Sequence, residues 1–200
     1  MASTSEPATE RPVRSDARRN RERVLAAARE AFTEVGPEVS LAEVARRAGV
    51  GQGTLYRHFP ARADLLGAIL VDGVATLCRR GAELAAAGPA GAALAGWLGL
   101  LLEHARVNQG LAGSYLSGGG LGERYPVTDC HEKIMGMAAR LLADAQRTGA
   151  ARADLTAVDL VQLIVGISLV TVRTQDSAQA DRLLAVALDG VRVGMATGRP

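Results

Sequence analysis

A chain of 200 residues, of which 48% are apolar and 3% aromatic, is long enough for one or two domains with a buried core. Its formal net charge is only +2, and its two cysteines are too few for a disulfide framework. No run of eighteen apolar residues is free of charges or helix breakers, and the first residues lack the apolar core of a signal peptide. The composition therefore argues against a membrane span and a secreted disulfide scaffold, and we expect a cytoplasmic protein.

Residue usage favours an all-α fold, because Ala and Leu dominate while β-branched and aromatic strand signals are sparse. The charge is unevenly distributed. Residues 11–62 carry eleven Arg against six acidic residues, whereas residues 63–200 have a net charge of −1. A basic first segment followed by a neutral one suits a nucleic-acid partner for the first segment only. The alternative is that the arginines simply form a solvated helix face.

The first predicted helix begins near Ser15 or Asp16 and ends at Gly36 and Pro37. Its apolar residues recur at helical spacing: Val24, Leu25, Ala28, Ala31, Phe32 and Val35. Arg14 and Arg18 lie at its start, where positive charge opposes the helix dipole and lowers helix stability. This placement indicates an anionic partner, so both arginines are candidate DNA contacts.

Residues 40–66 are the most informative segment and predict two short helices joined by a tight turn. Ser40 can cap the first helix, with Glu43 three residues on as in a capping box. Gly49 follows that helix, where a left-handed residue favours glycine. The second helix carries side chains that donate hydrogen bonds to phosphate or reach base edges: Gln52, Thr54, Tyr56, Arg57 and His58. This is the helix-turn-helix plan, whose second helix enters the major groove.

The same segment resembles the DNA-binding domain of the TetR family of transcriptional regulators. Three stretches carry the resemblance, which covers roughly the first third of the chain: Ala48-Gly49-Val50, Leu55-Tyr56-Arg57-His58-Phe59 and Asp64-Leu65-Leu66. Two positions depart from the family pattern. Gly51 replaces the usual Ser, which removes a side-chain cap from the second helix, and Arg62 replaces the usual Lys and keeps a cation there.

The resemblance implies roles for individual residues. Tyr56 and His58 match phosphate-contacting positions, although a core Tyr and a neutral surface His are the alternatives, and Phe59 is expected in the core. Gln52, Gly53 and Thr54 open the recognition helix, where base edges are normally read. Gly53 would let the backbone come close to DNA, and Thr54 would touch a thymine methyl group or a phosphate. Ser40 and Arg62 stand at helix starts, whose amides also point at phosphate.

Five further helical segments are predicted after the recognition helix. They cover residues 62–84, residues 90–107, residues 127–148 with Gly149 as the cap, a segment introduced by Asp154, Leu155 and Thr156, and residues 178–196. A short helix is expected around residues 111–116. Gly118, Gly119 and Gly120 do not follow a predicted strand, so we reject a phosphate-binding loop.

The sequence therefore divides into three parts. Residues 1–14 are interpreted as a disordered basic tail, residues 15–62 as the helix-turn-helix DNA-binding domain, and residues 63–200 as a helical effector-binding and dimerisation domain. The resemblance implies an effector cavity in the last of these. The candidate ligand-binding residues are Trp97, Leu101, His104, Tyr115, Ile134, Met137, Leu141 and Gln162. Mostly apolar walls with a few polar groups suit a small-molecule pocket, but they suit an ordinary helical core equally.

The last two helices carry more apolar surface than one small domain readily covers. A four-helix interface between two copies would bury it, and two-fold symmetry would match a palindromic operator. The candidate interface residues are Leu163, Gly166, Ile167, Val170, Leu183 and Val186.

Other kinds of site are poorly supported. Cys130 and His131 are adjacent and nothing has the spacing of a zinc site, so we expect no metal and no cofactor. A redox switch through Cys78 or Cys130 would need a lowered thiol pKa or a near partner. No nucleophile elbow, Walker loop or dinucleotide fingerprint is present, which argues against an enzyme.

We therefore expect a DNA-binding regulator that acts as a homodimeric repressor on double-stranded DNA and is released by a small-molecule effector. A ligand-independent repressor, or an enzyme or cargo-binding protein on the same scaffold, are the alternatives.

Overall fold

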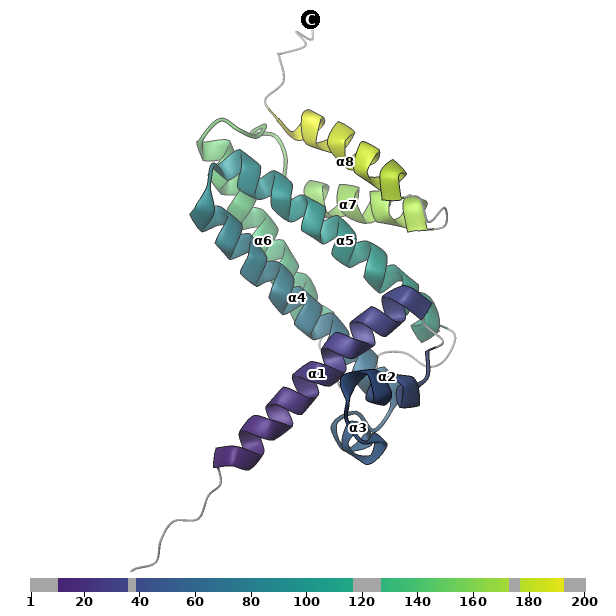
Figure 1. The fold of residues 1–200 in the computed structure, drawn as a ribbon. Helices are drawn as coiled ribbons and strands as arrows, with labels where there is room; N and C mark the ends of the chain where they lie inside the picture. Colours follow the sequence, from purple (N-terminus) through teal and green to yellow (C-terminus); the bar gives the residue numbers. More distant parts are fainter. Residues whose placement is uncertain (1–10, 36–38, 117–126, 173–176, 193–200) are drawn as a thin grey trace, which may run out of the picture. The chain divides into compact units, whose positions relative to one another are not determined.

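The structure is a computed structural model that describes residues 11–35, 39–116, 127–172 and 177–192 (Figure 1). In these ranges the chain forms eight helices and no strand, which confirms the predicted all-α fold. The chain separates into two compact units, Met1–Ile69 and Leu70–Pro200. The division falls inside helix α4 (Arg62–Ala87), whereas the sequence placed it at the beginning of that helix.

The first unit is built on α1 (Arg11–Val35), α2 (Leu41–Ala48) and α3 (Gln52–His58). Helix α1 begins at Arg11, before the predicted start near Ser15, and packs against α2 and α3. Most predicted apolar positions of the three helices fill the core between them: Val24, Leu25, Ala28, Ala31, Phe32, Val44, Ala45, Ala48, Leu55 and Phe59 are all buried. Val35, at the end of α1, is instead 59% exposed. A small closed core thus supports the helix-turn-helix segment.

The second unit contains the rest of α4 together with α5 (Ala90–Leu116), α6 (Val127–Arg147), α7 (Ala157–Val172) and α8 (Ser177–Val191). Helix α5 packs against α6 and α7, and α8 packs against α7 (Figure 1). Trp97 lies at the centre of the core with none of its surface exposed. Its Nε1 donates a hydrogen bond of 3.2 Å to the Leu77 carbonyl, which fastens α5 to α4.

Helix boundaries follow local chemistry at some ends and not at others. Gly149 has a φ of 70° and follows α6, as its predicted capping role requires. Helix α5, by contrast, continues to Leu116, where a break after Val107 and a separate short helix were predicted. A glycine inside a helix weakens it by about 1 kcal/mol relative to alanine but does not stop it, so Gly110 and Gly113 are tolerated there.

Two glycines of α4 permit close packing with α5 and α6. A Cβ atom at Gly81 would lie 2.8 Å from Trp97 Cδ1 and 2.9 Å from Met137 Cγ. A Cβ atom at Gly73 would lie 3.0 Å from Cε1 of His104. All three distances are shorter than a normal carbon–carbon contact. The glycines that interrupt the apolar pattern of α4 in the sequence therefore serve its packing.

Candidate nucleic-acid interface

The turn between α2 and α3 is fixed by Gly49 and an arginine from α1. Gly49 has a φ of 62°, a left-handed conformation that an L side chain adopts only with strain. Arg23 Nη2 donates to the carbonyl oxygens of Ala48 at 2.5 Å and Gly49 at 2.8 Å. These carbonyls stand at the end of α2, where helical partners run out. Hydrogen bonds from Arg23 of α1 therefore stabilise the turn that sets the angle between α2 and α3.

Helix α2 begins with the predicted cap and carries an ion-pair network. Ser40 Oγ accepts a hydrogen bond of 3.1 Å from the Glu43 backbone N–H. The Glu43 carboxylate accepts from Arg46 at 2.7 Å and from Arg47 at 2.8 Å, and Arg47 also pairs with Glu34 of α1 at 2.6 Å. Hydrogen bonds from Arg46 and Arg47 lower the pKa of Glu43 to about 2. The network joins α2 to α1 beside the helix-turn-helix.

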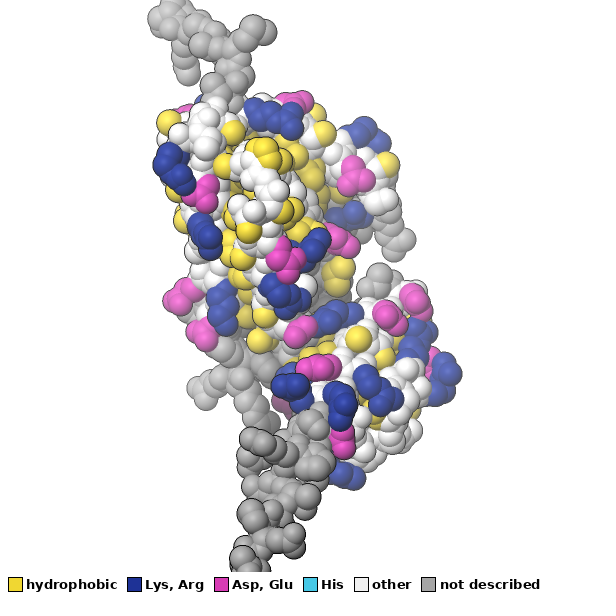
Figure 2. Space-filling model, turned by 60° about the vertical axis from the view of Figure 1, so that its left-hand side comes forward, with side chains coloured by type: hydrophobic (Ala, Val, Ile, Leu, Met, Phe, Trp, Pro, Cys, Tyr) yellow, Lys and Arg dark blue, Asp and Glu magenta, His cyan; other side chains and the backbone are white. Residues whose placement is uncertain are grey.

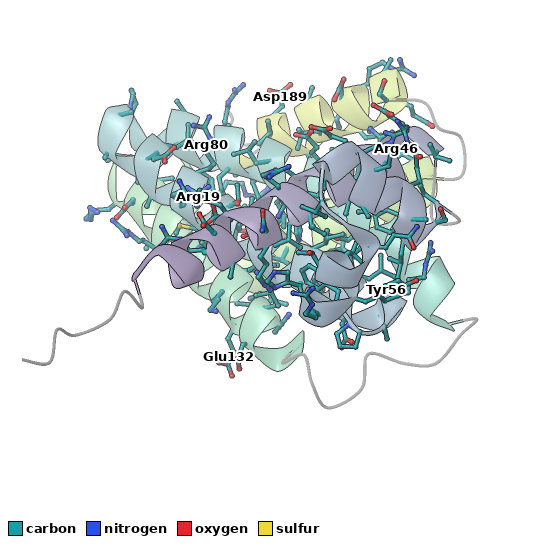
Figure 3. All side chains as sticks on the ribbon, turned by 60° about the horizontal axis from the view of Figure 1, so that its bottom comes forward. Arg19, Arg46, Tyr56, Arg80, Glu132 and Asp189 are labelled. Carbon is teal, nitrogen blue, oxygen red and sulfur yellow. The ribbon has the colours of Figure 1, made fainter. Side chains whose placement is uncertain are left out.

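The recognition helix α3 presents its predicted contact residues to solvent. Gln52, Gly53, Tyr56 and Arg57 are exposed, and Tyr56 keeps 48% of its surface accessible (Figure 3). Thr54 and His58 are half-buried. Leu55 and Phe59 face the core, which confirms the predicted burial of Phe59. The helix thus has one anchored side and one open side, as a groove-reading helix needs.

Glycines at the start of α3 have no packing reason to be glycines. Gly51 is the N-cap residue and provides no side-chain cap, as the sequence indicated. A Cβ atom at Gly53 would meet nothing within 4 Å, and its φ is not left-handed. Gly53 therefore lowers helix propensity without serving the chain's own fold. What a glycine at this position does allow is the close approach of another molecule, such as DNA, to the backbone.

Arg62 is held inside its own unit. Its Nη1 donates to the Val39 carbonyl at 2.7 Å, and its guanidinium lies 5.4 Å from the centre of the Phe32 ring. Its Nη2 is buried and has no hydrogen-bond partner. The structure therefore gives Arg62 a bracing role between α4 and α1 that the sequence did not predict. A phosphate contact at this position would have to use the backbone amides or the unpaired Nη2.

The arginines at the start of α1 are only partly described. The Arg18 side chain is 77% exposed and lies 3.6 Å from Glu22, and Arg19 pairs with Asp16 at 2.6 Å. The side chain of Arg14 lies outside the described residues. Arg18 can therefore turn to an anionic partner at little cost, because exposed pairs of this kind contribute little to stability.

The candidate ligand-binding residues of the second unit differ in burial. Trp97, Leu101 and Leu141 are at most 2% exposed and belong to the core, and Ile134 and Met137 pack at its edge. Gln162 is exposed on α7. The Tyr115 side chain lies outside the described residues. Gln162 therefore differs from the core members of the set, because its side chain is open to solvent in the single chain.

His104 is the polar member of the set that does lie inside the helical layer. Burial lowers the pKa of His104, so the imidazole is neutral at pH 7. Asn108 Nδ2 lies 2.8 Å from His104 Nε2 and 2.9 Å from the His104 carbonyl oxygen. The ring also occupies the space that Gly73 leaves on α4. The His104 ring of α5 therefore packs against α4, so a displacement of α5 at this residue would also displace α4.

Neither of two cavities that described residues of the second unit line includes His104. One of about 440 Å³ is lined mainly by small and apolar residues of α5, α8 and the segment after α6, and also by Arg192. The other, of about 170 Å³, includes Leu141 and the ion-paired Asp144 and Arg147. The larger volume is in the usual range for small-molecule sites. Leu141 alone of the candidate set lines either of these two cavities.

The candidate interface residues lie on α7 and α8 and differ in exposure. Leu163 is 44% exposed and Val170 is 60% exposed, while Val186 on α8 is 70% exposed. Gly166 lies on the same exposed face of α7, and Leu183 is half-buried. Ile167 is only 7% exposed and belongs to the core. Its assignment to a contact between copies is therefore corrected, because the side chain already packs inside its own subunit.

Several structural residues escaped sequence reasoning. Arg23, Arg47 and the buried Asp64, whose carboxylate accepts from the Ala61 N–H at 2.9 Å, all organise the helix-turn-helix. Asp64 had a local signal, since an acidic residue in the first turn of a helix is favoured. Arg47 also had one, since it stands four residues after Glu43. The partners of Arg23 lie 25 and 26 residues away, so no local pattern marks them.

Other kinds of site find no support within the described ranges. No cluster of three or more His, Cys, Asp or Glu residues there could hold a metal ion. None of the helices in those ranges combines the length and apolarity needed to cross a membrane. On the face drawn in Figure 2, basic and acidic side chains are interspersed with apolar patches.

Comparison with known protein families matches both units. The family described as bacterial regulatory proteins, tetR family, matches residues 24–69. The C-terminal domain described as transcriptional regulator SbtR-like matches residues 89–193. A helix-turn-helix-type transcriptional regulator of Staphylococcus aureus (strain USA300) is 44% identical over 54 residues, which are 26% of this chain and 29% of that protein. The chain therefore matches less than a third of that relative's length.

Solved structures cover the chain more fully. A TetR transcriptional regulator from Streptomyces coelicolor is 36% identical, with a TM-score of 0.74 over 86% of this chain and 98% of its own. A TetR transcription regulatory protein from Mycobacterium vanbaalenii is 34% identical, with a TM-score of 0.73 over 91% of this chain and all of its own. With the helix-turn-helix geometry and both domain matches, these likenesses establish that the chain belongs to the TetR family of DNA-binding transcriptional regulators.

Proposed function

We propose that this TetR-family regulator is a repressor that binds a palindromic operator as a homodimer and is released by a small-molecule effector. The open side of α3 carries the proposal. Gln52, Gly53, Tyr56 and Arg57 are exposed together on a helix whose other side is anchored by Leu55. In this docking Tyr56 and Arg57 bind phosphate, and Gln52 reads a base edge, with Thr54 and His58 beside them.

The exposed apolar residues of α7 and α8 support the homodimer. Five large apolar side chains of α7 are more than a third exposed: Val158, Leu163, Val165, Leu169 and Val170. The inward face of the same helix carries Ser168 and Thr171, whose hydroxyls donate to carbonyls of their own helix at 2.9 Å and 2.8 Å. A helix that turns apolar side chains outward is suited to a second apolar surface. A second copy supplies an identical, largely apolar face and the two-fold symmetry of a palindrome.

The effector part of the proposal rests on the family and on the larger cavity. A volume of about 440 Å³ lined by Leu94, Leu188 and Val191 suits a mostly apolar ligand, and Arg192 would favour one with an acidic group. A ligand releases the operator only if it binds the DNA-incompetent state more tightly than the competent one. A repressor that ignores small molecules is the competing model.

DNA recognition can be tested although the operator sequence is not known. Selection from a random duplex library should enrich a palindromic sequence, and its affinity should fall steeply with salt. Tyr56→Phe and Arg57→Ala should weaken binding to every duplex, whereas Gln52→Ala should relax base preference. Arg62→Ala is a poor probe, because it also removes the bond to Val39. Unchanged affinity in both Tyr56→Phe and Arg57→Ala would overturn this docking.

The effector is tested by thermal shift and operator release together. A small-molecule library should contain compounds that raise the melting temperature of the protein, since any ligand of the native state stabilises it. The repressor model with an effector requires that at least one of them also lowers operator affinity. Stabilising compounds that leave operator affinity unchanged would favour the ligand-independent repressor.

A further inference from the structure

The only two cysteines and the only lysine of this chain lie on neighbouring turns of α4 and α6. Cys78 belongs to α4, while Cys130 and Lys133 belong to α6. The other basic residues are all arginines and are spread over both units. Three nucleophilic side chains from distant parts of the sequence are therefore gathered where the two helices meet.

The contact between α4 and α6 is close at this level. The Cys78 thiol donates to the Lys133 carbonyl oxygen, with the sulfur 3.6 Å from that atom. One turn further along both helices, a Cβ atom at Gly81 would lie 2.9 Å from Met137 Cγ and Sδ. Residue numbers rise together along the two helices, so they run in the same sense here. The two helices therefore meet through the Cys78 thiol on a backbone carbonyl and through the Met137 side chain on Gly81.

Cys130 stands on the same face of α6 as Lys133, because residues three apart in a helix are neighbours on its surface. The Cys78 sulfur lies against the Lys133 carbonyl, so Cys130 stands about one helical turn from it along α6. The thiols are close enough that charge on Cys130 affects the ionisation of Cys78. Cys130 is therefore the thiol positioned to act as the near partner that a redox pair requires.

The two thiols differ in access to solvent. Cys78 is half-buried and open to small reagents, whereas Cys130 is 6% exposed. Burial raises the pKa of both thiols, and the positive charge of Lys133 acts against that rise at each of them. Neutral thiols react slowly at neutral pH, so any oxidation here is gradual and is helped by the lysine.

We propose that Cys78 and Cys130 form a reversible disulfide that joins α4 to α6 in the presence of a two-electron oxidant such as hydrogen peroxide. The Cys78 thiolate attacks one peroxide oxygen, the O–O bond breaks, and hydroxide leaves as water after protonation. The Cys130 thiol then attacks the resulting sulfenic acid, the S–O bond breaks, and a second water leaves. Two thiols are oxidised, one peroxide is reduced to two waters, and the S–S bond forms.

The position of this disulfide gives it a consequence for DNA binding, which rests on the proposed function. Helix α4 begins at Arg62 in the DNA-binding unit and ends at Ala87 in the second unit. A covalent bond from Cys78 to α6 fixes the later part of this helix. A conformational change that needs α4 to move along α6 is then blocked, so the oxidised chain should differ in operator affinity or in its response to an effector.

The chemical step is tested on the full-length protein by intact-mass and peptide-mass measurement after limited peroxide treatment. We expect a loss of two hydrogens per chain, a Cys78–Cys130 peptide, and recovery of both thiols with dithiothreitol. Cys78→Ser and Cys130→Ser should each prevent the product, and Cys130→Ala is the alternative if serine disturbs the core. Sulfinic acid or disulfides between chains, without the Cys78–Cys130 peptide, would overturn the proposal.

The role of Lys133 and of ionisation is tested by rate. Lys133→Gln should slow disulfide formation several-fold, whereas Lys133→Arg keeps the charge and should oxidise at a rate close to that of the wild type. Below the thiol pKa the rate should rise about tenfold per pH unit, as the thiolate fraction does. Equal rates in Lys133→Gln and Lys133→Arg would remove the lysine from the proposal.

Operator affinity separates this inference from the proposed function. If the reduced protein binds no duplex, the proposed function fails. The disulfide is then judged by the peptide-mass measurement alone. If the reduced protein binds its selected operator, the oxidised wild type should show altered affinity or altered effector release, and oxidised Cys78→Ser should not. A disulfide that forms without either effect would refute the regulatory part.

Discussion

Arg23 Nη2 lies 2.8 Å from the carbonyl oxygen of Gly49, the left-handed residue that ends α2. A Cβ atom at Gly49 would lie 2.7 Å from the same nitrogen. The turn of the helix-turn-helix therefore depends on two things at once, a residue without a side chain and an arginine that occupies the space beside it. The orientation of α3 follows from this pair.

Arg23→Met and Gly49→Ala should both destabilise the first unit, and their effects should not add. Arg23→Met keeps the apolar stem and removes hydrogen bonds worth about 1 kcal/mol. Gly49→Ala adds left-handed strain of about 1–2 kcal/mol and displaces the guanidinium. A double-mutant cycle measured by hydrogen exchange of α2 amides isolates the coupling. Strict additivity would mean that the arginine does not brace this turn.

Acid should weaken α2 through Glu43. Its pKa in the folded protein is about 2, below the ordinary value of 4.5, because Arg46 and Arg47 donate to it. A carboxyl whose pKa is lowered by folding stabilises the folded state above pH 4.5, and this contribution disappears as pH falls toward about 2. Glu43→Gln should flatten the pH dependence of the unfolding free energy in that window. Ser40→Ala, which removes only the cap, should lower stability at every pH without changing the slope.

The recognition helix should gain stability from a side-chain cap. Gly51 occupies the N-cap position with φ −66° and ψ 146°, a conformation open to any residue, and a Cβ atom there meets nothing nearer than Thr54 Oγ1 at 4.0 Å. Gly51→Ser should therefore stabilise α3 by a few tenths of a kcal/mol. Thermal unfolding of the protein and hydrogen exchange of the α3 amides would measure it. A lowered melting temperature would show that the N-cap is more crowded than the structure indicates.

The sequence predicted those parts of the fold that local chemistry determines. The Ser40 cap, the left-handed Gly49 and Gly149, and the burial of Phe59 all agree with the structure, because each signal lies within a few residues of its effect. The bond from Arg23 to the end of α2 depends on tertiary packing across 25 residues, so no short motif contains it.

The orientation of α7 shows a second limit. Apolar residues surround this helix almost completely, so their periodicity does not reveal which face is inward. Ile167 faces the core, whereas Val170 and Gln162 are exposed, and only the packed structure distinguishes them. The exposed position of Gln162 therefore could not be predicted from the sequence.

Gly81 should be sensitive to substitution while a matched glycine of α6 is not. Gly81→Ala would bring a methyl group 2.8 Å from Trp97, which is fully buried and bonded to Leu77. Overpacking of this kind destabilises by about 1–3 kcal/mol. Gly136→Ala has open space and should stabilise by about 0.5–1 kcal/mol through helix propensity. Urea unfolding followed by Trp97 fluorescence compares the two variants, and a stabilised Gly81→Ala would show that α4 is loosely seated.

The proposed contact between copies is tested at Gly166. A Cβ atom at this position meets nothing within 4 Å, so the subunit itself does not need a glycine there. Leu163 and Val170 are exposed three residues before it and four after it, which places Gly166 on the apolar face. If two copies of α7 approach most closely at this glycine, Gly166→Leu should separate them. Gly136→Leu, also directed into open space, should leave the assembly unchanged.

Sedimentation equilibrium at micromolar concentration measures this contact. We expect a wild-type dimer, a dimer for Gly136→Leu, and a dissociation constant raised at least tenfold for Gly166→Leu, which corresponds to about 1.4 kcal/mol. Val186→Glu should act in the same direction from α8, because its side chain is 70% exposed and a carboxylate buried against an apolar face is unfavourable. Ile167→Glu is unsuitable, since Ile167 lies in the core and its loss would unfold the subunit. A monomeric wild type would refute the dimer. A dimer whose dissociation constant is unchanged by both Gly166→Leu and Val186→Glu would require an interface away from these helices.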